Sequence, residues 1–334
     1  MKSLNDRIIW IFAWITSLTL CGCNSKSFGM FDESDAIHIN RFDSVFFQWI
    51  ESDDETSFQR LKGEYPQMLE VFGKTVLQTN DTNSPAFFTN LKNRYAEPAV
   101  QTLYKDAMTS YAQNSSVEKE FTFGFRQLKK LFPAMQIPVV YMHVSRLQQN
   151  MIIADSLLSC SIDKYMGADY PLYKDLFSDY RRKEMIPERM VKDGFSAWLL
   201  SEFPYQGKSN VLLDRMIYEG KIIYILTKIG NDYTYKEILS LTETEYKWLL
   251  NYESALWTTL IERKHLYTPD AATTSRYFQP IPSTFISEEA PGNLGKFIGY
   301  RIVERYMKQT KSTCENLMNN NNAQDILNKS KYKP

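Results

Sequence analysis

Residues 212–224 read LLDRMIYEGKIIY, and the spacing of their apolar side chains predicts an amphipathic helix. Glu219 departs from this pattern, because it lies three residues after Met216 and therefore on the apolar stripe. Gly220 beside it would let the backbone of another helix come close, although glycine lowers helix stability by about 1 kcal/mol. The polar face is predicted to hold Asp214, Tyr218 and Lys221.

A second helix is predicted to begin at Thr242, because Thr242-Glu243-Thr244-Glu245 has the spacing of a capping box. Glu253 lies in the middle of the apolar face of this helix. The other members of that face are Leu249, Leu250, Leu256, Trp257, Leu260 and Ile261. Each of the two helices is therefore predicted to carry a carboxylate on its buried side.

Glu219 and Glu253 are the candidate residues of a buried-acid groove. A lone buried carboxylate is unfavourable by several kcal/mol, so each glutamate needs a cationic partner or a proton. Two interpretations remain open: structural ion pairs in a partly wet groove, or a catalytic or metal site, since buried acids cluster at such sites. The candidate partners are Arg215, Arg276, Arg301 and Arg305.

The strand-like segments of the chain lie in its first half. Their β-branched and aromatic residues predict strands at 37–42, 137–144, 150–154 and 156–162. A turn at Asp155 would join the last two. The sequence therefore predicts an α+β fold that is predominantly helical, with a small N-terminal sheet followed by helices.

Further helices are predicted at 45–62, 99–131 and 187–203. The last long helix should begin after Pro291-Gly292. On that helix Gly295 and Gly299 share one face, and small residues four apart permit close packing of two helices within the core.

The N-terminus has the pattern of a bacterial export signal. Lys2 and Arg7 precede an apolar run over residues 8–20, which is followed by Cys21-Gly22-Cys23. The ending resembles the lipobox read by lipoprotein signal peptidase, and Cys21 fits it less well than Cys23, because bulky Leu20 would precede the cut. We expect a signal peptide over 1–22, a lipidated Cys23, a polar tether over 23–35 and a single domain over 36–334; an uncleaved anchor is the alternative.

The charge balance excludes nucleic acid as a partner. The chain has a net charge of 0, and removal of residues 1–22 takes away Lys2, Arg7 and Asp6, which leaves −1. Nucleic-acid binding needs a basic footprint, so the expected membrane attachment depends on lipid at Cys23. Cys160 and Cys314 are the two other cysteines, and whether they form a disulfide is left open.

No catalytic motif is found in the sequence. The three histidines, His38, His143 and His265, are scattered and form no His-Glu-x-x-His pattern. A Gly-x-Ser-x-Gly elbow, a phosphate-binding loop and a dinucleotide-binding turn are all lacking. The sequence thus predicts a protein that is not an enzyme, with no catalytic residues, no metal and no cofactor, although paired acids for sugar hydrolysis stay formally possible.

Several segments, taken in order, resemble the gliding-motility lipoprotein family GldB of Bacteroidetes, over nearly the whole mature chain. These segments are the lipobox with Cys23, Arg41-Phe42-Asp43, 162–167, 212–221, Asn251-Tyr252-Glu253 with Trp257, Leu266-Tyr267, Pro291-Gly292, Gly295, Ile298-Gly299, Ile302-Val303-Glu304 and Tyr306-Met307.

The resemblance implies a place in the cell-envelope machinery for gliding and linked protein secretion. The family is also distantly similar to a group of predicted zinc peptidases, in which a histidine-bearing helix precedes a helix with Glu-Gly. Glu219-Gly220 matches the second helix, whereas the segment 187–203 contains no histidine. The resemblance therefore implies a zincin-like scaffold without its metal, with Glu219 as a relic.

We therefore expect a non-catalytic lipoprotein. It should face the periplasm, because surface-exported lipoproteins of the Bacteroidetes type often carry an acidic block after the lipidated cysteine, and none follows Cys23. It would be anchored through the diacylglyceryl and acyl chains, such as palmitate, on Cys23, and its partners would be other envelope proteins. One alternative is a hydrolase, either a degenerate metallopeptidase or a glycan-cleaving enzyme, that uses the acidic groove. The other is a glycan-binding lipoprotein.

Overall fold

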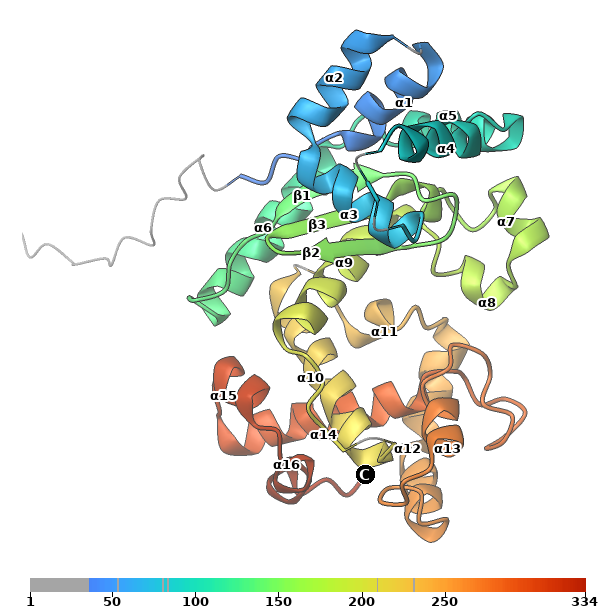
Figure 1. The fold of residues 1–334 in the computed structure, drawn as a ribbon. Helices are drawn as coiled ribbons and strands as arrows, with labels where there is room; N and C mark the ends of the chain where they lie inside the picture. Colours follow the sequence, from blue (N-terminus) through green and yellow to red (C-terminus); the bar gives the residue numbers. More distant parts are fainter. Residues whose placement is uncertain (1–35, 53, 80, 83, 209, 231) are drawn as a thin grey trace, which may run out of the picture. The chain divides into compact units, whose positions relative to one another are not determined.

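The computed structural model describes residues 36–334 except residues 53, 80, 83, 209 and 231. The predicted signal peptide, the tether and Cys23 lie outside the described residues. Helices dominate the described part, and one three-stranded sheet accompanies them (Figure 1). The predicted α+β class with a predominance of helix is confirmed.

The sheet has the strand order β1-β3-β2. Its strands are β1 (Val139–His143), β2 (Met151–Ala154) and β3 (Leu157–Ser161). β3 pairs parallel with β1 and antiparallel with β2, to which it is joined by a two-residue turn at Asp155-Ser156. All three strands fall inside the predicted segments, and the turn at Asp155 is confirmed.

The predicted strand at 37–42 is wrong. In this fully described segment only Asn40 forms a bridge to β1, and helix α1 (Phe42–Ser52) begins at Phe42. Phe42 and Phe46 are both fully buried, with ring centres 5.5 Å apart. Phe42 and Phe46 are four residues apart and therefore lie on one face of a helix. This helical pattern determines the local structure, and the short alternation of residues before Phe42 does not.

The first half of the described chain has more helices than predicted. The segment 45–62 is divided because Asp54 caps a new helix, where its side chain accepts a hydrogen bond from the Ser57 backbone N–H at 2.7 Å. The segment 99–131 is also divided, although its predicted end at Leu131 is confirmed. The helices that follow α1 here are α2 (Glu55–Glu64), α3 (Pro66–Val76), α4 (Pro85–Tyr95), α5 (Pro98–Ser110) and α6 (Ser115–Leu131).

The long helices of the second half lie where the sequence predicts them. They are α9 (Pro187–Glu202), α10 (Leu212–Ile229), α12 (Glu243–Glu262) and α14 (Leu294–Thr310). The capping box at the start of α12 is confirmed, with both of its reciprocal hydrogen bonds present. The shorter elements are η2 (Ile162–Lys164), α7 (Pro171–Leu176), α8 (Asp179–Arg182), α11 (Tyr235–Ile238), α13 (Ala271–Arg276), α15 (Cys314–Asn319) and α16 (Ala323–Ser330).

α10 is the helix around which this half is built. It packs against α6 and α9 on one side and against α14, α15 and α16 on the other, as Figure 1 shows. At the crossing with α14, a Cβ added to Gly299 would lie 1.8 Å from the carbonyl oxygen of Met216. The close helix packing predicted for Gly299 is therefore confirmed, and it lies within the core.

The two cysteines of the described part do not pair. Cys160 lies buried in β3, Cys314 is partly exposed at the start of α15, and both are free thiols. Burial raises the pKa of the Cys160 thiol. This settles the question that the sequence left open.

Candidate functional site: the cleft around Glu219

Glu219 lies on α10 with only 13% of its side chain exposed. Its Oε1 is 2.6 Å from Nη2 of Arg215, one turn earlier on the same helix. The Arg215 guanidinium lies 5.4 Å from the ring centre of Tyr205 and 5.8 Å from that of Tyr218. Arg215, one of the four predicted partners, thus neutralises Glu219 and is itself held by aromatic rings.

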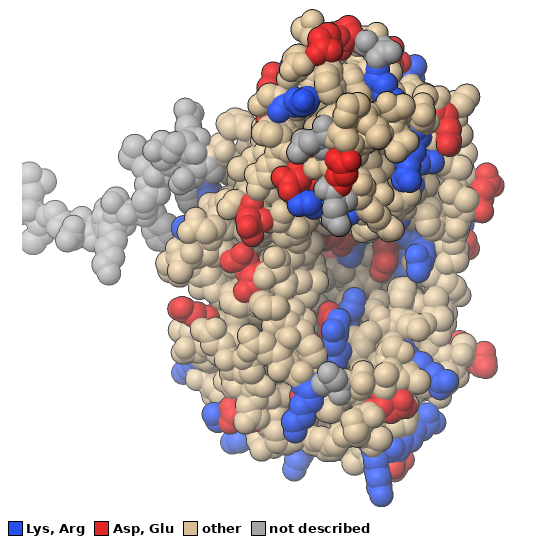
Figure 2. All heavy atoms as spheres, viewed as in Figure 1, with Lys and Arg blue, Asp and Glu red and all other residues tan. Residues whose placement is uncertain are grey.

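Glu219 lines a cleft between α9, α10, α11 and the start of α14, with a cavity volume of about 60 Å³. Figure 2 shows that the viewed face is hollowed near its middle and that acidic and basic side chains lie in the hollow. The ionisable residues that line the cleft with Glu219 are Arg189, Lys192, Asp193 and Lys296. The aliphatic floor consists of Ile222, Ile223, Leu226, Ile238 and Leu239.

Asp193 is the acid that α9 contributes to the cleft. Its Oδ1 accepts a hydrogen bond from Arg189 at 2.5 Å, and its Oδ2 accepts one from the hydroxyl of Tyr165 at 2.9 Å. Burial and the nearby Asp193 carboxylate raise the pKa of Tyr165 well above its usual value, so the phenol remains a donor. Both carboxylates of the cleft are therefore held by a guanidinium.

Lys192 and Lys296 have a different environment from the two acids. Lys192 Nζ donates to the backbone carbonyl of Glu188 at 2.8 Å and lies 4.8 Å from the ring centre of Tyr233. Lys296 is half-buried. Within the described residues neither lysine has a carboxylate within ion-pair distance.

Glu253 makes a separate set of contacts on α12. It is 7% exposed and lies at the centre of the buried face of that helix, as predicted. Arg301 on α14, another of the four predicted partners, donates through Nε to its Oε1 at 2.9 Å, and the hydroxyl of Tyr332 donates to the same atom at 2.8 Å. None of Glu253, Arg301 and Tyr332 lines the Glu219 cleft, so the two predicted acids have separate partners.

The histidines lie apart from both acids. His38 is exposed, His143 is buried in β1 with Nδ1 2.7 Å from the Ser159 hydroxyl, and His265 contacts the Tyr277 hydroxyl at 2.8 Å. Burial lowers the pKa of His143 to about 3, which keeps the ring neutral. Across the described ranges, no group of three or more His, Cys, Asp or Glu side chains could hold a metal ion.

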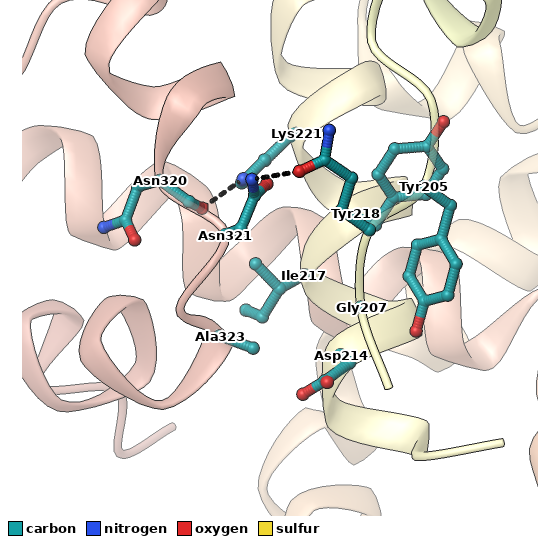
Figure 3. Close-up of a pocket in the computed structure, with 10 residues that line it drawn as sticks. Tyr205, Gly207, Asp214, Ile217, Tyr218, Lys221, Asn320, Asn321 and Ala323 are labelled. Atoms are coloured by element: carbon teal, nitrogen blue, oxygen red, sulfur yellow. Dashed lines mark hydrogen bonds between the residues drawn. The ribbon is translucent and has the colours of Figure 1, made fainter. Parts of the chain in front are cut away.

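The sequence did not reveal the burial of Lys221. This lysine was expected on the polar face of α10, but it is only 4% exposed. Its Nζ donates to the backbone carbonyl of Asn320 at 2.5 Å, and Figure 3 shows the contact. Burial lowers its pKa to about 8. The expectation is wrong because the chain after α15 folds over this face and supplies carbonyl acceptors instead of water.

The fold and the cleft together define a helix-dominated α+β protein whose central acids are held in ion pairs. A family model described as gliding motility protein GldB matches residues 31–334, and the chain belongs to this lipoprotein family. Membership connects the chain with gliding motility and agrees with anchoring to a membrane through lipid. No curated protein and no solved structure matches the chain.

Within the part of the chain that the structure describes, no helix combines the length and the apolar composition needed to cross a bilayer.

Proposed function

We propose that this protein is a lipid-anchored, non-catalytic component of the envelope machinery for gliding motility and linked protein secretion, and that it faces the periplasm. Membership in the GldB family supports the connection with gliding. The lipobox supports attachment through diacylglyceryl and acyl chains on Cys23. Two or more chains hold a protein on a membrane far more firmly than one.

One observation carries the non-catalytic part of this proposal: both cleft carboxylates are held by arginines. A general acid or base must exchange its proton near neutral pH. A guanidinium instead lies 2.6 Å from Glu219 and another 2.5 Å from Asp193, so each carboxylate is engaged in an ion pair. Each of these ion pairs joins two residues one turn apart on the same helix, and we infer that the acids are structural and transfer no protons.

The test is to compare two kinds of strain under otherwise equal conditions. Deletion of the gene should abolish colony spreading and secretion. The isosteric double variant Asp193→Asn/Glu219→Gln should retain at least half of both activities at normal protein level, because it preserves shape and polarity. Loss of both activities at normal protein level would favour a catalytic role for the acids.

A second candidate is a hydrolase of the metallopeptidase type. The observation in its favour is that α9 packs against α10, so that Asp193 and Ser196 of α9 line the cleft beside Glu219. In the zinc peptidases that the sequence resembles, a histidine-bearing helix would stand at this position, although α9 itself contains no histidine. Stoichiometric zinc in the purified lipoprotein, lost on substitution of Glu219, would support this candidate over the first.

A further inference from the structure

The cleft around Glu219 has more positive charge than its own acids neutralise. Asp193 is paired with Arg189 and Glu219 with Arg215. Lys192 and Lys296 line the same cleft, and among the described residues neither has a carboxylate partner. Neither ammonium group is neutralised by a carboxylate, although that of Lys192 lies over the ring of Tyr233, which lines a neighbouring pocket with Glu120 and Glu237.

The two lysines are the cations of the cleft that can bind an entering anion. The planar fork of an arginine binds two oxygens of a carboxylate or a phosphate at once. Both arginines near the cleft already use their forks on Asp193 and Glu219. The lysines that remain act as point charges, and they can each pair with a single carboxylate.

The floor of the cleft indicates what surrounds that carboxylate. Five aliphatic side chains from α10 and the α11 region form it, and no aromatic ring is among the described lining residues. The cavity volume of the cleft is about 60 Å³, well below that of small-molecule pockets. The cleft therefore suits side chains of a polypeptide and not a whole small-molecule ligand.

We propose that the cleft binds an acidic segment of a partner protein, whose carboxylates pair with Lys192 and Lys296 while its apolar side chains contact the aliphatic floor. This inference rests on the proposed function, because it assigns to the cleft the contact with the envelope machinery. Charge complementarity at such a contact contributes to specificity and to the rate of association.

The test uses the full lipoprotein in detergent and a fluorescent peptide in which glutamate alternates with leucine. Its counterpart carries glutamine in place of glutamate. We expect the acidic peptide to bind at least about tenfold more tightly than the glutamine peptide, with an affinity that falls as salt rises. Equal affinity of the two peptides, or no binding of either, would overturn the proposal.

Matched variants locate the binding. Lys192→Gln/Lys296→Gln should weaken binding of the acidic peptide at least about tenfold. The control is Lys247→Gln/Lys308→Gln, because these two lysines are 68% and 70% exposed and lie outside the cleft. It should change the affinity less than twofold. Displacement of the peptide by inorganic phosphate, at concentrations where acetate has no effect, would contradict the carboxylate assignment.

The failure of this inference can be distinguished from the failure of the proposed function. If cells that lack the protein spread and secrete normally, the proposed function fails whatever the peptide does. If deletion stops both activities but the cleft variant binds the acidic peptide as well as the unaltered protein, only the inference about the cleft fails.

Discussion

Gly220 on α10 and Gly299 on α14 lie against each other where the two helices cross. A Cβ added to Gly220 would lie 2.3 Å from both the carbonyl carbon and the carbonyl oxygen of Gly299. Contacts this short with backbone atoms cannot be relieved by rotation of a side chain. The crossing therefore depends on the absence of a side chain at both positions.

Substitution of Gly299 by alanine should destabilise the protein. The added methyl group would lie 1.8 Å from the Met216 carbonyl oxygen, so the two helices must move apart. Overpacking of this kind costs about 1–3 kcal/mol, and a contact with backbone belongs at the upper end. The free energy of unfolding in urea measures the effect.

Gly63→Ala is the control for this prediction. A Cβ added to Gly63, on α2, would have no atom within 4 Å, so alanine should stabilise the helix by up to about 1 kcal/mol. Equal stability of the two alanine variants would show that α10 and α14 cross far enough apart to leave room for a methyl group at Gly299.

Substitutions of Glu253 and Arg301 should be strongly coupled in their effects on the free energy of unfolding. Arg301→Met leaves the buried carboxylate with only the Tyr332 hydroxyl, and because Arg301 is 32% exposed we expect a loss of about 1–3 kcal/mol. Arg301→Met combined with Glu253→Leu should lose less than Arg301→Met alone, since no charge is then left unpaired. Additive losses in the double-mutant cycle would contradict this.

The buried Lys221 should make stability depend on pH in the alkaline range. Its pKa is about 8 in the folded protein, against 10.5 for a lysine surrounded by water, so between these values the unfolded chain binds more protons. Stability contributed at this site should therefore rise with pH, by up to about 3 kcal/mol between pH 8 and 10.5.

The comparison with Lys221→Met isolates this effect, because ionisation of tyrosines affects both proteins alike. We expect the difference in unfolding free energy to move in favour of the unaltered protein as pH rises from 8 to 10.5. A difference that stays constant over this range would mean that the lysine titrates alike in both states.

Membrane attachment should depend on Cys23. Cys23→Ser removes the thiol that we propose takes the diacylglyceryl group, so the protein should move from the membrane pellet to the soluble fraction. Cys21→Ser is the control and should remain in the pellet. A Cys23→Ser protein that still pellets would indicate an uncleaved anchor.

Much of the fold follows from local pattern in the sequence. The turn at Asp155 and the capping box at Thr242 are correct because they depend on neighbouring residues alone. The position of Glu253 is correct because helical period fixes which side chains share a face. The same rule fails for Leu250 and Ile261, which were placed on the buried face but are 41% and 51% exposed.

The tertiary contacts could not be predicted from the sequence. Arg301 was one of four candidate partners, and only the packing of α12 on α14 selects it for Glu253. Lys221 looks solvent-exposed on a helical wheel, and its burial follows from a segment about a hundred residues later that covers it. The place of Asp193 in the cleft could not be predicted, because single acidic residues are common on the polar faces of helices.

The hydrogen bond from Tyr332 to Glu253 joins positions 79 residues apart. In a chain that folds as it is made, α12 is complete long before residue 332 is available. Until then Glu253 has at most one of its two partners, Arg301. The buried polar contacts of α12 can therefore be complete only when nearly the whole described chain is present.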